Sequence, residues 1–268
     1  MKSSILLIGL SLFLIGGCTV AEPSILASAP DGVRKRASQR QAEPRPKSKI
    51  ARPSETQVPA QRDGASEPAL PAWSVPSQKP STVLVSTLTP TELFLKVSSA
   101  VYALAAEGQP PRQLTSQGSA VAVSSKEAIT NCHIVANAKS IILANAARTL
   151  RAEVVSADPS TDRCYLRVAE GELDPVAGIR DYKTLAVGEV VFTIGSPKGL
   201  VNTLGSGLLS GLRKSEGPQY IQITAPVSEG SSGGGLFDER GNLIGVTTFT
   251  VRDSQNLNFA IAASEFWR

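Results

Sequence analysis

The sequence contains one histidine, His133, in 268 residues. It also lacks a Gly-Lys-Ser/Thr phosphate loop, and the glycines of residues 205–211 miss the spacing of a dinucleotide fingerprint. These absences exclude the common nucleotide-binding motifs, and no internal repeat suggests a repeat architecture. We expect no cofactor and no metal.

Long hydrophobic runs are missing as well. The longest, Ile5–Gly17, follows Lys2 and is too short for a normal membrane span, but it is typical of the apolar part of an export signal. We therefore expect residues 1–17 to be a signal peptide. The run ends directly before Cys18, which resembles a bacterial lipobox, so Cys18 would be lipidated and anchor the protein to the membrane. The alternative is an ordinary signal peptide with a chance cysteine.

The segment 18–88 differs from the rest of the chain. It holds most of the 18 prolines, and basic residues gather between Arg34 and Arg52. We expect this segment to be a disordered tether. Its basic residues either keep it solvated and extended by mutual repulsion or attract it to an anionic envelope surface. Thr19 follows the cysteine, as in lipoproteins of the outer membrane, and this resemblance implies an outer-membrane anchor facing the periplasm. Nucleic acid is not expected as a partner of an exported protein.

Folded structure is predicted from residue 89 to residue 268. Thr89, Pro90 and Glu92 form a capping box, which predicts a short helix that ends before an extended run at Val101–Leu104. Later short apolar runs, separated by glycine and polar turns, indicate strands of a sandwich or of one or two barrels. These expected strands are 119–123, 128–130, 140–144, 151–156, 165–168, 190–194, 207–212, 220–223, 243–249 and 257–260.

Two short segments combine residues suited to acyl transfer. Ser232 stands in the run Gly230–Gly235, where glycine permits a tight turn that exposes the hydroxyl. A serine hydroxyl needs an adjacent base, and the single histidine, His133, is the candidate. The amides of Gly230 and Ser232 could converge as an oxyanion hole.

A carboxylate that orients His133 is expected at Asp162, because this residue opens an apolar run. Asp158 precedes proline and is interpreted as a turn residue. Cys132 and Cys164 lie close in sequence to His133 and Asp162, so they form either a disulfide or two buried thiols.

Several motifs in one order resemble the trypsin-like serine proteases of the HtrA/Deg type, over about residues 90–263. The segments that carry the resemblance are 119–121, 130–135, 158–166, 194–199, 230–234, 241–246 and 258–261. The resemblance implies an all-β fold of two six-stranded, chymotrypsin-like barrels after a short N-terminal helix, with the site between the barrels. It also implies a catalytic triad of His133, Asp162 and Ser232 that acts on protein or peptide substrates.

The resemblance further implies the residues at the substrate pocket. Thr248 would support Asp162 and, together with Val227, Phe249 and Thr250, lie at the pocket. Because Val227 is not acidic and Phe249 is bulky, we expect a shallow apolar pocket for small or medium aliphatic residues before the scissile bond.

The sequence departs from the usual family pattern after the nucleophile, where Gly235 replaces proline, and it ends at Arg268, so no PDZ domain is expected. Two functions remain open. The first is an envelope serine endopeptidase, and the second is a weakly active or inactive protease-like domain that serves as a tethered binding module.

Overall fold

The computed structural model describes residues 70–75, 79–83, 86–108, 114–214, 217–251 and 255–268. The expected signal peptide 1–17, the lipidation site Cys18 and the tether up to residue 69 lie outside the described residues. Within the described ranges, no helix has both the length and the apolar character needed to cross a membrane.

Helix α1 (Pro90–Val97) opens the main body of the structure. The Thr89 side chain accepts a hydrogen bond from the Glu92 amide at 3.3 Å, and the Glu92 carboxylate accepts from the Thr89 amide at 2.9 Å, so the expected capping box is present. Leu93 and Val97 form the buried face of the helix. A short 3-10 turn, η1 (Ser98–Ala100), then leads directly into the first strand.

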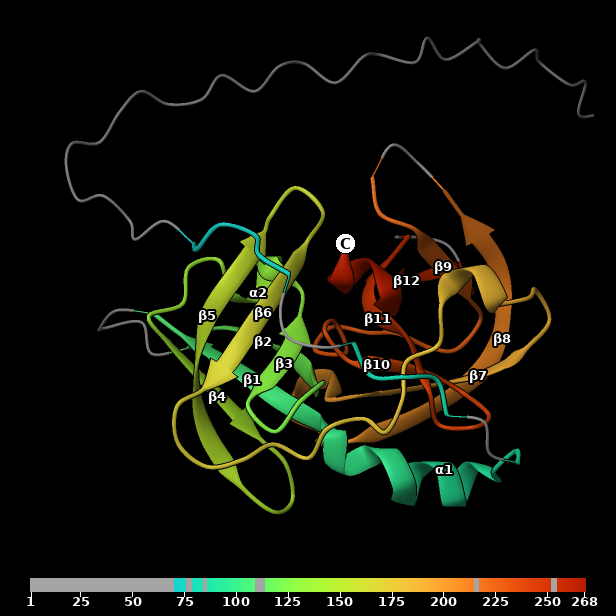
Figure 1. Cartoon of the computed structure of the whole chain (residues 1–268), viewed down its shortest axis with the longest axis horizontal. Coiled ribbons are helices and arrows are strands. Elements are labelled where there is room, and N and C mark those ends of the chain that lie inside the picture. Colours follow the sequence, from blue (N-terminus) through green and yellow to red (C-terminus); the bar gives the residue numbers. More distant parts are fainter. Residues whose placement is uncertain (1–69, 76–78, 84–85, 109–113, 215–216, 252–254) are drawn as a thin grey trace, which may run out of the picture. The chain divides into compact units, whose positions relative to one another are not determined.

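The first half of the domain is a closed barrel with the strand order β1-β2-β3-β6-β5-β4 (Figure 1, green to yellow). All neighbouring strands pair antiparallel. The strands are β1 (Val101–Glu107), β2 (Leu114–Ala122), β3 (Glu127–Thr130), β4 (Ser140–Ala144), β5 (Thr149–Asp158) and β6 (Arg163–Val168), and a single helical turn, α2 (Cys132–Val135), follows β3.

The second half is another closed barrel, ordered β10-β11-β12-β9-β8-β7 (Figure 1, orange to red). Its strands are β7 (Val190–Gly195), β8 (Thr203–Arg213), β9 (Tyr220–Ile223), β10 (Gly235–Asp238), β11 (Leu243–Thr250) and β12 (Asn258–Ala262). Three short 3-10 turns, η2 (Tyr182–Thr184), η3 (Pro197–Gly199) and η4 (Ala263–Trp267), complete the described elements. The expected all-β fold of two six-stranded barrels is confirmed.

Three apolar clusters hold this arrangement together. One fills the first barrel around Leu143 and Leu166, and another fills the second barrel around Ile221 and Leu236. The third lies between the barrels and joins side chains of both barrels with those of α1 and η4. Because burial of apolar area is the main stabilising contribution to folding, this shared cluster fixes one barrel against the other and thereby fixes the cleft between them.

Part of the segment expected to be tether packs on the domain. The Trp73 indole donates to the carbonyl oxygen of Arg268 at 2.9 Å and lies 5.5 Å from the Tyr165 ring. Further along, the Val83 amide donates to the Asn242 side chain at 2.7 Å. The described residues before Thr89 therefore follow the domain surface, and the packed chain begins earlier than the sequence indicated.

Candidate active site

The single histidine lies on α2, directly after the buried strand β3. Its backbone amide donates to Asp162 Oδ1 at 2.9 Å, and its ring Nδ1 lies 2.8 Å from Asp162 Oδ2. One carboxylate thus holds both the backbone and the ring of His133. The His133 side chain is 51% exposed, whereas that of Asp162 is 26% exposed, so the carboxylate is the more shielded partner. The contact to Nδ1 leaves Nε2 as the nitrogen available for proton transfer.

Asp162 occupies the tight turn between β5 and β6 with a positive φ of 59°. Aspartate is one of the few non-glycine residues that adopt this left-handed conformation readily. Its backbone carbonyl accepts hydrogen bonds from the Cys132 amide at 3.4 Å and the Asn131 side chain at 3.2 Å. These contacts explain the unusual backbone, because the turn aims both the carbonyl and the carboxylate of Asp162 at the segment that carries His133.

Thr248 supports the same carboxylate from the second barrel. Its hydroxyl donates to Asp162 Oδ2 at 3.1 Å. The register of β11 against β12 shifts between Thr247 and Phe249, which places Thr248 at a β-bulge. A bulge re-aims a side chain relative to the strand, and here it accompanies a buried threonine that reaches across to the first barrel.

Asp158 has a different environment from Asp162. Its carboxylate accepts hydrogen bonds from Ser160 and Thr161 and pairs with Arg163 at 2.8 Å. Burial alone would raise the pKa of the Asp158 carboxyl, but these hydrogen bonds and the Arg163 charge lower it below its usual range. These partners of the Asp158 carboxylate all lie within five residues of it, so Asp158 stabilises the turn rather than orienting His133.

A disulfide joins Cys132 and Cys164, whose Cα atoms lie 5.0 Å apart. Cys132 precedes His133 directly, and Cys164 lies on β6, opposite Thr130 of β3. Both cysteines are buried. The bond therefore joins the segment that carries the histidine to the strand that follows Asp162.

Ser232 lies in the turn before β10, in the second barrel. The turn contains two glycines with positive φ, 89° at Gly230 and 82° at Gly233, a conformation that strains other residues. The Ser232 hydroxyl donates to the carbonyl oxygen of Thr248 at 2.8 Å. Rotation about its Cα–Cβ bond changes this contact without moving the backbone, so the hydroxyl can reorient when a substrate binds.

The backbone around Gly230 has the features of an anion site. The carbonyl of Glu229 accepts from the Lys198 amide at 3.1 Å. In a trans peptide the C=O and the next N–H point in opposite directions, so the Gly230 amide points away from Lys198. Within the described part of the chain, neither the Gly230 amide nor the Ser232 amide has an acceptor. Both are free to bind a developing oxyanion.

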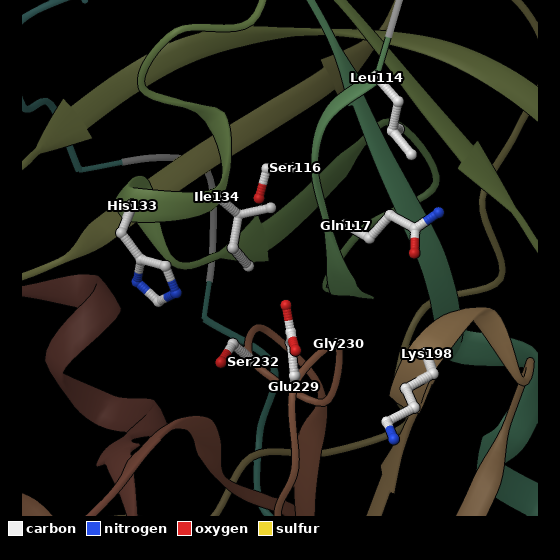
Figure 2. Close-up of a pocket in the computed structure, with 9 residues that line it drawn as sticks. All are labelled: Leu114, Ser116, Gln117, His133, Ile134, Lys198, Glu229, Gly230 and Ser232. Carbon is white, nitrogen blue, oxygen red and sulfur yellow. The ribbon is translucent and has the colours of Figure 1, made fainter.

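A cavity of about 600 Å³ brings these groups together (Figure 2). His133 and Ile134 line it from the first barrel, and Gly230 and Ser232 line it from the second. The remaining described lining residues are Leu114, Ser116, Gln117, Lys198 and Glu229. The site is therefore a cleft between the barrels with histidine and serine on opposite walls.

The residues expected at the substrate pocket lie outside this cavity's described lining. Phe249 is 44% exposed, and its ring stacks on Phe259 at 4.9 Å and meets the edge of Tyr220 at 5.7 Å. Val227 packs against the core of the second barrel, and Thr250 is exposed. The structure thus brings Thr248 to Asp162 and places Phe249 in an aromatic cluster with Tyr220 and Phe259.

Sequence reasoning missed the role of Asn131. This side chain is buried, and its amide nitrogen donates to the Asp162 carbonyl. Asparagine is favoured directly before a helix, but the Asn131 side chain makes no capping hydrogen bond to α2, so this preference gave no signal for its contact with Asp162. The helical turn itself was not predicted, since four residues show no periodicity.

Known proteins provide an independent comparison. Residues 118–246 match the protein family described as "Trypsin-like peptidase domain". These residues are therefore similar to that family. The matched range contains all three proposed triad residues, in the order histidine, aspartate, serine.

Proteins with similar sequences carry the names of serine proteases. The putative serine protease HhoB of Synechocystis is 33% identical over 160 residues, which covers 56% of this chain and 38% of HhoB. A probable periplasmic serine endoprotease, DegP-like, of Pseudomonas putida is 35% identical over 163 residues, covering 58% and 34%. This chain therefore spans well under half the length of these relatives.

A solved structure, the HtrA-type protease AlgW with tripeptide, superposes with a TM-score of 0.61 and 30% identity. The superposition covers 66% of this chain and 61% of AlgW. This similarity agrees with the fold of two closed barrels described above.

Proposed function

We propose that this protein is a serine endopeptidase of the bacterial cell envelope. One observation carries the proposal: the Asp162 carboxylate holds the backbone amide and the ring Nδ1 of His133, at 2.9 and 2.8 Å, across a cleft from Ser232. This is the arrangement in which an imidazole accepts a proton from a serine hydroxyl while a partly buried carboxylate stabilises the imidazolium.

The reaction follows from these positions. Ser232 Oγ attacks the peptide carbonyl carbon as its proton passes to Nε2 of His133, and the carbonyl oxygen becomes an oxyanion beside the amides of Gly230 and Ser232. The C–N bond then breaks, and His133 returns the proton to the leaving amine. Water, deprotonated by His133, hydrolyses the acyl-enzyme and restores Ser232.

A preference for small or medium aliphatic residues before the scissile bond accompanies this proposal. It rests on the apolar Val227 and on Phe249, whose ring is held by Tyr220 and Phe259. A peptide library that varies only this position tests it. Cleavage concentrated after Val, Ala or Leu is the expected result, and cleavage concentrated after Arg or Lys would overturn the preference.

We further propose that residues 1–17 are a signal peptide and that a lipid on Cys18 anchors the protein to the outer membrane, facing the periplasm. Relatives named periplasmic are consistent with this location. Metabolic labelling with a palmitate analogue should mark the wild-type protein and fail to mark Cys18→Ser. Equal labelling of both proteins would contradict the anchor.

The competing function is a protease-like binding module with little hydrolysis. One contact favours it, because the Ser232 hydroxyl donates to the Thr248 carbonyl. A fluorophosphonate probe separates the two functions, since it reacts only with an activated serine. We expect wild-type protein to be labelled and Ser232→Ala to remain unlabelled. Folded wild-type protein that stays unlabelled would favour the binding module.

A further inference from the structure

Ser119, on β2 of the first barrel, reaches across to the loop that carries the proposed nucleophile. It is fully buried. Its backbone amide donates to the Ser232 carbonyl at 2.8 Å, and its hydroxyl donates to the Gly230 carbonyl at 2.9 Å. The same hydroxyl oxygen accepts from the Ser196 amide at 2.9 Å. One side chain thus joins three segments, and its hydroxyl acts as both donor and acceptor.

Strand β2 and the loop that carries Ser232 meet closely at this point. A Cβ atom added to Gly233 would lie 2.0 Å from the Ser119 carbonyl oxygen, and one added to Gly195 would lie 3.3 Å from the Ser119 hydroxyl. The first distance is far below any van der Waals contact, so only glycine at position 233 allows β2 to approach. The nucleophile loop therefore rests directly on Ser119.

These contacts decide how Gly230 is oriented. The peptide before Gly230 is held because the Glu229 carbonyl accepts from the Lys198 amide. The peptide after it is held because the Gly230 carbonyl accepts from Ser119. Glycine is otherwise free to turn, and with both flanking peptide planes held, its φ and ψ are fixed. The Gly230 amide then stays directed away from Lys198, toward the side on which an oxyanion can accept its hydrogen bond.

Ser119 is also linked to the segment of the proposed base. The Thr130 hydroxyl donates to the Ser119 carbonyl at 2.7 Å, and both residues are buried. Thr130 is the last residue of β3, three positions before His133. A short chain of hydrogen bonds therefore runs from the start of the histidine segment, through Ser119, to Gly230.

We propose that Ser119 is a positioning residue that holds the Gly230 amide in its oxyanion-binding orientation. The proposal rests on the proposed function, because it assigns a role within the same acyl-transfer site. Ser119 does not touch the substrate and acts through Gly230. Replacing its hydroxyl leaves the Gly230 carbonyl and the Ser196 amide without their partner, and the peptide between Gly230 and Ser231 gains freedom to turn.

Ser119→Ala should therefore lower kcat and leave KM within about twofold. Loss of a whole oxyanion donor costs about 100- to 1000-fold in kcat, so misorientation of one donor should cost less, roughly 10- to 100-fold. A merely structural role would lower stability without this separation of kcat from KM.

A peptidyl trifluoromethyl ketone gives a direct readout of the oxyanion site. Ser232 Oγ adds to the ketone carbon, its proton passes to His133, and the ketone oxygen becomes an oxyanion. Fluorine NMR follows the ionisation of this oxygen with pH. Because a well-placed amide stabilises the anion, the pKa of this oxygen should be higher in Ser119→Ala than in the wild type.

Ser156→Ala is the matched control. Ser156 is also a buried serine of the first barrel, and its hydroxyl joins two backbone groups of Ser74, far in sequence from the nucleophile loop. It should match the wild type in kcat and in the pKa of the adduct oxygen. If Ser119→Ala does not fold, Ser119→Cys keeps a similar size with a weak donor and should show the same two changes to a smaller degree.

The role of Ser119 would be overturned if folded Ser119→Ala kept the wild-type kcat and the wild-type pKa of the adduct oxygen. If Ser119→Ala does not fold, the same result in Ser119→Cys would overturn it. A wild-type protein that neither hydrolyses peptides nor forms the adduct would overturn the proposed function itself. A normal wild type together with a defective Ser119 variant and a normal Ser156→Ala supports the inference.

Discussion

The Cys132–Cys164 disulfide should contribute strongly to stability. Its cysteines are 32 residues apart in sequence. Closing a loop of that length removes conformational entropy from the unfolded chain worth about 4 kcal/mol at 25 °C. For a domain of roughly 200 residues, each kcal/mol corresponds to about 2–4 °C in Tm, so the expected decrease without the bond is about 8–16 °C.

The test compares Cys18→Ser with the triple variant that also carries Cys132→Ala and Cys164→Ala. Cys18→Ser leaves only the two buried cysteines, so thiol counting in denaturant is unambiguous. We expect no free thiol in Cys18→Ser before reduction and two after it. Thermal unfolding followed by circular dichroism should show the lower Tm in the triple variant.

The loss should fall on stability and spare turnover. The Cys132 amide and the Asn131 side chain still bond the Asp162 carbonyl, and the His133 amide still bonds its carboxylate. At 25 °C, kcat of the triple variant should therefore stay close to that of Cys18→Ser. Two free thiols in unreduced Cys18→Ser, or Tm values within about 2 °C of each other, would refute the reasoning.

Three further predictions concern single contacts. Thr248→Val removes the hydroxyl that bonds Asp162, and this loss should lower kcat/KM roughly two- to twelvefold, the equivalent of about 0.5–1.5 kcal/mol. Unchanged kinetics would contradict its support of the carboxylate. Gly233→Ala should lower the free energy of unfolding in urea by more than about 3 kcal/mol, because the φ of Gly233 is 82° and an added Cβ would collide with backbone. Gly188→Ala is the control, because Gly188 has a φ of 99° but open space around it, and its cost should be about 1–2 kcal/mol. Equal costs would refute the close approach at Gly233. Asp158→Asn should lower the free energy of unfolding at pH 7, and its difference from the wild type should shrink below about pH 4. The reason is that folding lowers the pKa of the Asp158 carboxyl, which gives stability that is present above the unfolded pKa and lost as the pH falls. A constant difference from pH 7 to pH 3 would contradict this.

The barrels were predictable because many of their strands are short apolar runs between turns. β3 and β9 begin and end within a residue of the expected positions. β10 was missed, because Gly235 belonged to the glycine run and only three residues follow it in the strand. Its pairing with β7 and β11 buries all four residues, and such burial depends on neighbours that are distant in sequence.

Residue types, their order and the family resemblance were enough to propose the candidate triad, but they could not predict its geometry. The left-handed turn at Asp162 depends on contacts with Asn131 and Cys132, which are distant in sequence, and the bulge at Thr248 accompanies a contact between the barrels. The same holds for Ser119, which looks like an ordinary small strand residue until Gly230 and Ser232 lie against it. Local sequence preferences carry no information on such approaches, because the partners come from other segments.

The central claim is that His133 and Ser232 act together in peptide hydrolysis. The most direct measurement is the turnover of an unfolded protein substrate by folded His133→Ala, with Ser232→Ala alongside. Since the chain has no second histidine to substitute for the first, we expect both variants to lose nearly all the hydrolysis that the wild type shows. Hydrolysis retained at the wild-type rate in His133→Ala would contradict the account.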